Sequence, residues 1–323
     1  MEFKIIFFST HQKSCNKYMR LNDNTKSKYY SKIKISFIFM NYILLVNLFD
    51  IIFSKNILFF IQFSSSNKIT LKVKESGTRM IFSSETNFFD TNYYPDEVKI
   101  NGITQNIVNH TYFFEKSDNN VELIWNNPID KCSNMFRSCH DVNEVDLSYF
   151  DTSQIINMEF MFYNCQFLTS INLANFDTSK VTSMWSLFNL CTRITSLDLS
   201  KFNTSKVKSM LNMFYYCYTL TSLDLSNFDT SLVTSMQGMF KECNKLEYIN
   251  MKKFTELNLI DTVNMFLNVP NNIIICINEN NNNKIISELK DKNGHQINCS
   301  DDLIINQKNI NPDLNKFVPN NLQ

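Results

Sequence analysis

A 26-residue period in the middle of the chain limits the possible folds more than any other feature. Cysteine recurs at this spacing, and phenylalanine recurs with it, eleven residues after each cysteine. The two series are Cys139, Cys165, Cys191, Cys217 and Cys243, and Phe150, Phe176, Phe202, Phe228 and Phe254. A unit of this size cannot bury its apolar face alone, so the period predicts a stack of similar units.

Each unit contains two hydrophobic patterns. In "LTSLDLSNF", Leu223 and Leu225 alternate with polar residues, which is typical of a strand with one buried face. In "KVTSMWSLFNLC", apolar residues recur every three or four positions, which predicts a short helix. Neighbouring strands lie about 4.8 Å apart, whereas packed helices need about 8–10 Å. We therefore predict a curved α/β solenoid with one short parallel strand and one short helix per repeat, and with the strands on its concave face.

The repeat also resembles a known family. The stretch "LTSLDLSNFDTSLVTSMQGMFKEC" (Leu220 to Cys243) is similar to the repeat of the BspA-like leucine-rich-repeat surface proteins, which follows the pattern LxxLDLSxFDTSxVTxMxxMFxxC. The similarity extends from about Ile129 to Val269. It implies a leucine-rich-repeat solenoid on a surface-exposed or secreted protein, with adhesion or binding of host matrix proteins in some members. It implies no catalytic residues.

The sequence divides into six parts. They are a basic N-terminal tail (1–34), a hydrophobic signal or anchor segment (35–63), a β-rich N-terminal cap (68–127), the leucine-rich-repeat solenoid (128–269), a C-terminal cap (270–302) and a polar tail that we expect to be disordered (303–323). Caps are expected at both ends, because an open stack exposes apolar core and an unpaired sheet edge.

The hydrophobic segment 35–63 leaves three alternatives open. Its apolar run is long enough to cross a bilayer, but Asp50 and Lys55 interrupt it. It is a signal anchor that follows a cytoplasmic basic tail, a cleavable secretory signal with translation starting at Met40, or a buried segment of a soluble protein. The first two alternatives place the repeats at the cell surface or in the secreted fraction, and the third leaves them in the cytoplasm.

Composition and motifs argue against several functions. Lys and Arg together number 31, as do Asp and Glu, and the repeats offer no basic face for nucleic acid. The chain has four glycines and lacks the P-loop, GxSxG and GxGxxG motifs. Its four histidines share no spacing with cysteines or acids that indicates a triad or a metal site. We therefore expect no enzymatic activity, no cofactor and no metal.

The predicted concave face carries the candidate binding residues. With Leu223 and Leu225 pointing inward, the alternate polar residues point outward. The candidates are the lateral row Asp146, Asn172, Asp198, Asp224 and Asn250, with Glu144, Tyr248 and Lys252 at its ends. The row is either a strip for a cation or basic ligand, or a solvated sheet face in which asparagine dilutes the repulsion between carboxylates.

Other side chains have structural or conditional roles. The repeated cysteines do not converge on one point as metal ligands must, so we expect buried thiols that act as small hydrophobes. Cys276 and Cys299 are a candidate disulfide of the C-terminal cap in an oxidising compartment. Candidate glycosylation sites are Asn109, Asn203 and Asn298. In the block "FDTS", the oxygens of Asp177, Thr178 and Ser179 are expected to cap the first N–H groups of a helix.

These observations predict a non-enzymatic, surface-exposed or secreted leucine-rich-repeat protein. Its solenoid would bind a protein or an extracellular-matrix macromolecule, and residues 35–63 would contact the membrane. The alternative is an intracellular leucine-rich-repeat adaptor that recruits another protein through the same solenoid.

Overall fold

The computed structural model describes residues 67–84, 89–106, 110–278, 282–290 and 295–297. All of them belong to one compact unit, Ser65–Gln323. The basic tail, the hydrophobic segment 35–63 and the polar tail 303–323 lie outside the described residues. Within the described ranges, no helix has both the length and the apolar character needed to cross a bilayer.

An antiparallel region precedes the repeats. It contains β1 (Asn67–Val73), β2 (Gly77–Met80), the 3-10 helix η2 (Thr91–Tyr93), β3 (Glu97–Ile100), β4 (Ile103–Gln105), β5 (Thr111–Phe114) and β6 (Asn119–Trp125). Strand β1 pairs on one side with β6 and on the other with β7 (Glu144–Asp146), the first strand of the repeats. The edge of the repeat sheet is therefore covered at this end, within a sheet of order β4-β3-β6-β1-β7-β8.

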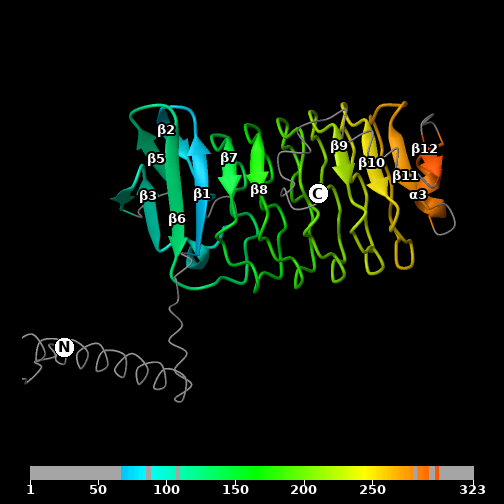
Figure 1. The fold of residues 1–323 in the computed structure, drawn as a ribbon, viewed down its shortest axis with the longest axis horizontal. Coiled ribbons are helices and arrows are strands. Elements are labelled where there is room, and N and C mark those ends of the chain that lie inside the picture. The colour runs from blue at the N-terminus through cyan, green and yellow to red at the C-terminus, as the bar shows by residue number, and fades with distance from the viewer. Residues whose placement is uncertain (1–66, 85–88, 107–109, 279–281, 291–294, 298–323) are drawn as a thin grey trace, which may run out of the picture. The chain divides into compact units, whose positions relative to one another are not determined.

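The repeats then stack side by side along the long axis of this unit (Figure 1). Their strands are β7, β8 (Ser170–Asn172), β9 (Ser222–Asp224) and β10 (Tyr248–Met251), followed by β11 (Ile274–Ile277), the α-helix α3 (Asn283–Ser287) and β12 (His295–Ile297). Strand pairs β7–β8, β9–β10, β10–β11 and β11–β12 are parallel. We call each 26-residue unit a coil. We number coils 1 to 6 by the residues Cys139, Cys165, Cys191, Cys217, Cys243 and Val269.

The predicted α/β leucine-rich-repeat solenoid, with one strand and one helix per repeat, is wrong: the described repeats contain no helix, and residues 196–198 of coil 3 form no strand. The nine residues that end at each numbered position, such as Ser183–Cys191 in coil 3, form overlapping turns; we call them the turn segment. Alternate N–H groups of this segment donate to the next coil, as Ser186 does to Leu211 (2.9 Å) and Phe188 does to Met213 (2.9 Å). The N–H groups between them bond three residues back, as Leu187 does to Met184 (3.2 Å). An α-helix would use all of these N–H groups internally.

Spacing explains why turns replace the helix. Helices need about 8–10 Å between axes, whereas the turn segments share backbone hydrogen bonds and lie as close together as strands. The phenylalanine rings beneath the turn segments stack with centroids 5.4–5.8 Å apart. Rings on the strand side are 6.1 and 6.4 Å apart. The described coils therefore lack the splaying that one helix per repeat would impose.

The core consists of two columns of buried phenylalanines. One column runs under the turn segments through Phe136, Phe162, Phe188, Phe214, Phe240 and Phe266. The other stacks Phe176, Phe202 and Phe228 where each chain leaves its strand. Trp125 of β6 lies 5.0 Å from Phe150 and so covers the N-terminal start of the second series. Burial of these rings supplies much of the apolar stabilisation of the stack.

The "FDTS" block joins coils and does not cap helices. The buried hydroxyl of Thr178 accepts the N–H of Asn203 (2.7 Å) and donates to the carbonyl of the same residue (3.0 Å). Thr204 and Thr230 make the same pair of bonds to the following coil. The carboxylate of Asp177 accepts the N–H of Ser179 (2.8 Å), which closes a turn. The expected capping role is therefore corrected to a ladder between neighbouring coils.

Replacing Thr178 with Val tests this ladder. The substitution preserves shape but leaves the N–H of Asn203 without its acceptor, so we expect the free energy of unfolding to fall by about 1–3 kcal/mol. Thr178→Ser keeps the hydroxyl and should lose less. Chemical denaturation of both variants measures the difference, and equal losses would contradict the ladder.

Candidate binding surface

The side-chain oxygens of the lateral row predicted to bind ligands accept hydrogen bonds from the backbone. The Oδ1 atoms of Asp146, Asn172, Asp198, Asp224 and Asn250 each accept the N–H of the residue two positions later, at 2.9–3.3 Å. An amide oxygen serves this turn as well as a carboxylate oxygen does, which explains the exchange of Asp and Asn. The row therefore stabilises the turn that follows each strand segment.

The ends of this strand face also have local partners. Tyr248 and Asn250 are buried (5% and 2% exposed), and burial, with the nearby carboxylate of Asp224, raises the pKa of Tyr248. Glu144 pairs with Lys74 (3.1 Å) across the junction between β7 and the N-terminal strands. Because these side chains are buried or already paired, fewer of them are available to bind a ligand than the sequence predicts.

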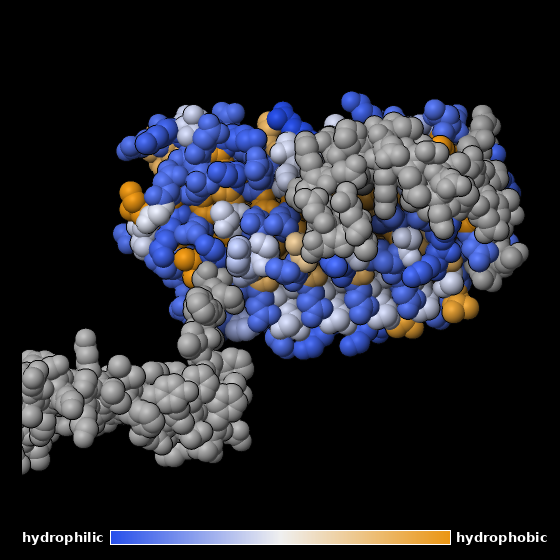
Figure 2. All heavy atoms as spheres, viewed as in Figure 1, coloured by the Kyte–Doolittle hydropathy of each residue, from blue (hydrophilic) through white to orange (hydrophobic). Residues whose placement is uncertain are grey.

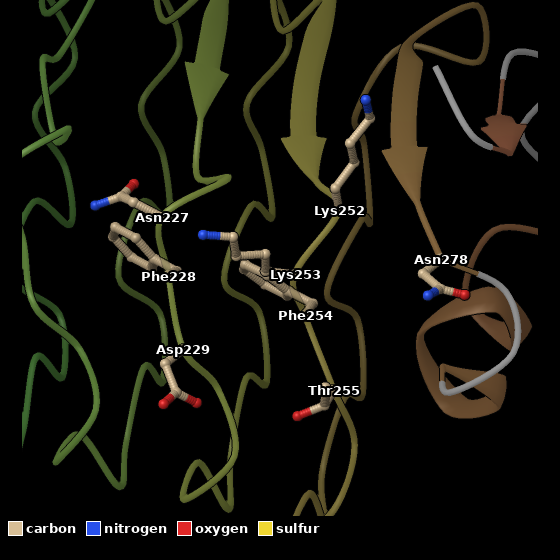
Figure 3. Close-up of a pocket in the computed structure, with 8 residues that line it drawn as sticks. All are labelled: Asn227, Phe228, Asp229, Lys252, Lys253, Phe254, Thr255 and Asn278. Atoms are coloured by element: carbon tan, nitrogen blue, oxygen red, sulfur yellow. The ribbon is translucent and has the colours of Figure 1, made fainter. Parts of the chain in front are cut away.

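A hollow of about 470 Å³ lies where β9 and β10 end (Figure 3). Its lining residues are Asn227, Phe228, Asp229, Lys252, Lys253, Phe254, Thr255 and Asn278. Figure 3 shows Lys253 extended toward Asn227 while Lys252 points away from it. The amide of Asn227 already donates to the carbonyl of Phe202 (2.8 Å), and the carboxylate of Asp229 accepts the N–H of Ser231 (2.9 Å). Both side chains therefore hold the corners of the coils.

A second hollow, of about 510 Å³, lies between the N-terminal strands and coil 1. The indole N–H of Trp125 donates to the carbonyl of Tyr93 (3.0 Å), and Asp96 accepts the N–H of Asn126 (2.7 Å). The polar groups on this wall thus tie β6 to the segment that precedes β3.

The repeated cysteines form a buried ladder. Each thiol from coil 2 to coil 5 donates to the carbonyl of the phenylalanine 29 residues earlier, as Cys191 does to Phe162 (3.1 Å). Burial raises the pKa of these thiols well above the ordinary value. A neutral, buried thiol is a poor nucleophile and a poor metal ligand, so the ladder packs and bonds the coils.

The remaining predicted sites are only partly described. Cys276 is disulfide-bonded, and Cys299 lies outside the described residues. Asn203 is exposed, and its Oδ1 accepts the N–H of Ser205 (3.1 Å), whereas Asn109 and Asn298 lie outside the described residues. Among the residues that the structure describes, no three His, Cys, Asp or Glu side chains are grouped as metal ligands.

The sequence analysis missed a surface of aromatic residues on the outer side of the turn segments. We call it the aromatic strip; it consists of Phe160, Tyr163, Trp185, Tyr215, Tyr216 and Tyr218. Trp185 is 37% exposed and the others are half-buried. These residues occupy equivalent or adjacent positions in coils 2 to 4, so the register of the stack places them on one side. Comparing the coils column by column would have revealed them, because the other coils carry polar or aliphatic residues at these positions.

Ring contacts connect the aromatic strip across coils. Phe160 lies 4.7 Å from Trp185 in the next coil, and Tyr215 lies 4.1 Å from Tyr216. Cationic groups flank both clusters. The guanidinium of Arg137 lies 5.0 Å from the Phe160 ring, and the ammonium of Lys241 lies 5.1 Å from the Tyr215 ring. The strip thus combines flat apolar surface with positive charge.

Two members of the aromatic strip have an unfavourable backbone conformation. Phe160 (φ 56°) and Tyr216 (φ 59°) are left-handed, a region in which bulky residues are rare. Coils 1, 4 and 6 place Asn134, Asn212 and Asn264 at the position of Phe160, and coils 2 and 6 place Asn164 and Asn268 at the position of Tyr216. Asparagine tolerates this conformation better. Leu190 (φ 63°) and Glu242 (φ 63°) adopt the same conformation at the position of Tyr216, so the backbone cost is not confined to the aromatic residues.

Comparison with known proteins connects the repeats to one family. Residues 85–197, 130–251, 164–274 and 219–317 each match the family described as "Mycoplasma protein of unknown function, DUF285". No curated protein and no solved structure matches the chain.

The corner carboxylate of Asp229 provides a pH test of the turns. The N–H of Ser231, followed by its hydroxyl, lowers the pKa of Asp229. A lowered pKa contributes stability above the unfolded value of about 3.9, and this contribution is lost as the pH falls through the folded value. Asp229→Asn keeps the acceptor, as Asn203 does in coil 4. We expect the stability advantage of the wild type to shrink between about pH 5 and pH 2. Denaturation midpoints that stay equally separated over this range would contradict it.

Proposed function

The chain belongs to the DUF285 repeat family, and from this premise we propose that it is a non-enzymatic protein that binds another macromolecule. The partner is a protein or an extracellular-matrix component, and the contact surface is the aromatic strip. The observation that carries the proposal is the exposed Trp185, which contacts Phe160 of the neighbouring coil within a surface flanked by cationic groups.

The chemistry of the aromatic strip supports this assignment. Trp, Tyr and Arg dominate the energetics of protein interfaces, because they combine large apolar area with a polar or charged group. Arg137 and Lys241 border the strip. The strand face is the weaker candidate, since its acceptor oxygens close turns at the strand ends. A partner that lies along the strip would contact several coils at once, which suits an extended surface or filament.

Two features support a location at the cell surface or in the secreted fraction. The repeat resembles that of the BspA-like surface proteins, some of which are linked to adhesion. Cys276 is disulfide-bonded, and disulfides persist mainly in oxidising compartments. An intracellular adaptor remains the alternative function, with the same surface recruiting a cytoplasmic protein.

Tyr216→Asn and Trp185→Ala test the binding surface. Against immobilised fibronectin, laminin and collagen, we expect each variant to lose about 2 kcal/mol of binding free energy, as interface anchors do. Tyr216→Asn should leave the free energy of unfolding unchanged or higher, because asparagine relieves the left-handed strain. Surface plasmon resonance and denaturation measure the two effects.

Asp198→Asn is the matched control for these variants. It removes a charge from the strand face but keeps the acceptor of its turn, and we expect wild-type binding. Loss of binding in Asp198→Asn but not in Tyr216→Asn would move the site to the strand face. Absence of wild-type binding to all three matrix proteins would contradict the matrix-binding proposal.

Fusing residues 1–66 to a reporter enzyme tests the location. We expect the reporter to reach the membrane or the medium, because the apolar run is long enough to direct export. The control fusion carries Leu44→Arg and Leu45→Arg, which interrupt that run and should retain the reporter in the cytosol. A wild-type fusion that stays cytosolic would favour the adaptor.

A further inference from the structure

A row of five residues crosses the aromatic strip, with one residue from each of coils 1 to 5. We call it the outer row; its members are Arg137, Tyr163, Asn189, Tyr215 and Lys241. The N–H group that follows each of the first four members donates to the carbonyl of the next member, at 2.7–3.0 Å. The five residues are therefore neighbours in the stack. The two ends of the row are four coils apart, or about 20 Å at the strand spacing.

A cation lies over a tyrosine ring at each end of the outer row. The guanidinium of Arg137 is 4.9 Å from the ring of Tyr163, and the ammonium of Lys241 is 5.1 Å from the ring of Tyr215. Lys241 forms no ion pair with a carboxylate of the described residues. The outer row thus presents two well-separated positive charges beside flat ring faces.

The centre of the outer row is a buried amide with an unsatisfied oxygen. Asn189 is 5% exposed, and its Nδ2 atom donates to the hydroxyl of Ser186 (3.1 Å). Its Oδ1 atom has no hydrogen-bond partner in the part of the chain that the structure describes. The N–H of Asn189 bonds three residues back (3.3 Å), as those of Tyr163 and Tyr215 do (3.1 and 3.2 Å), so the three side chains leave the backbone on the same side. A buried acceptor without a donor destabilises the fold, and a ligand that supplies a donor would remove this cost.

These groups match the chemistry of a sugar chain. The C–H faces of a sugar ring pack against the negative face of an aromatic ring, and the sugar hydroxyls donate hydrogen bonds. The aromatic strip supplies ring faces on coils 2 to 4, and Asn189 supplies an acceptor among them. A carboxylate on the chain would pair with a cation at either end of the row. A chain of repeating sugars also suits a surface whose residues recur with each coil.

We propose that the outer row binds a linear, unsulfated polysaccharide that carries carboxylates on alternate sugars. The two cations match sparse negative charge. Glu159 and Glu242 directly precede Phe160 and follow Lys241 in the sequence, so a densely sulfated chain would meet repulsion there. Because the polysaccharide would occupy the aromatic strip, the proposal rests on the proposed function and narrows its partner to a glycan.

A second exposed apolar surface lies at the C-terminal end of the stack. Leu257 and Ile260 are each 77% exposed, and Val263 and Leu267 are also exposed. Figure 2 shows hydrophobic residues at the surface low in the view at this end. These side chains are aliphatic and offer no ring faces to a sugar. The polysaccharide is therefore assigned to the outer row.

Trp185 provides a signal for binding. It is 37% exposed, whereas Trp125, the other tryptophan of the chain, is 4% exposed and donates to the carbonyl of Tyr93. The Oδ1 atom of Asn189 lies below the surface, so a sugar hydroxyl reaches it when a surface ring turns, and exposed side chains change rotamer within nanoseconds. Binding should therefore change the fluorescence of Trp185, and Trp185→Phe should abolish this signal while keeping a ring face.

Titration of hyaluronan oligosaccharides into the full chain, followed by calorimetry and fluorescence, tests the proposal. We expect Asn189→Leu to bind about tenfold more weakly than the wild type, because it lacks the acceptor. Its denaturation midpoint should not fall, because the unsatisfied oxygen is gone. Lys241→Gln should bind about threefold more weakly. The control Lys201→Gln removes the same charge from an exposed position outside the aromatic strip and should bind like the wild type.

Carboxyl-reduced hyaluronan separates the charge from the rest of the ligand and keeps the test valid if Asn189→Leu fails to fold. The wild type should bind the reduced chain more weakly than hyaluronan, and Lys241→Gln should discriminate less between the two chains. Equal binding of both chains by the wild type, or equal losses in Lys201→Gln and Lys241→Gln, would overturn the proposal, because either result indicates a site elsewhere.

Deglycosylated fibronectin, laminin and collagen distinguish failure of this proposal from failure of the proposed function. If the wild type binds one of them, Trp185→Ala weakens that binding, and hyaluronan does not bind, the partner is a protein. The polysaccharide is then overturned and the proposed function stands. If the wild type binds neither hyaluronan nor any matrix protein, both proposals are overturned.

Discussion

The structure depends on one constraint: neighbouring coils must keep nearly the same spacing on the strand side and on the side of the turn segments. On the strand side, parallel pairing at about 4.8 Å joins coils 1 and 2 and coils 4 to 6, whereas residues 196–198 of coil 3 form no strand. The opposite side satisfies it through turn segments whose alternate N–H groups cross to the next coil. With both sides at one spacing, phenylalanine rings and cysteine side chains fall into columns that run through the stack. A substitution in one coil therefore also changes the packing and hydrogen bonding of the two coils beside it.

The corners of the coils show how a chain with four glycines can turn so often. Asp and Asn oxygens close a turn where each strand ends and again before each turn segment. Buried threonines bond both backbone groups of the coil that follows. Most left-handed positions within the turn segments carry Asn, Ser or Gly, which tolerate them. The exceptions within the turn segments are Phe160, Leu190, Tyr216 and Glu242, and of these only Phe160 and Tyr216 belong to the aromatic strip.

Much of the core was predictable, because burial follows the repeat. The 26-residue period identifies the phenylalanines and cysteines that are buried, and alternation around Leu223 marks the strand that becomes β9. The helix was wrong because apolar residues three and four apart, such as Met184 and Leu187, also face one side in a series of tight turns. Periodicity records which side chains are buried, but it does not record where the N–H groups of Ser186 or Phe188 find acceptors.

The sequence by itself determined the repeat, its period, the identity of the buried columns and the absence of recognisable catalytic motifs. The tertiary structure decided the rest, because each decisive contact joins residues about one period apart. Such contacts include Thr178 with Asn203, Arg137 with Phe160, and Phe160 with Trp185. They show that the Asp and Asn row closes turns, and they bring the rings of the aromatic strip together across coils. Local pattern specifies burial, whereas the partner of each backbone group is settled only when coils stack.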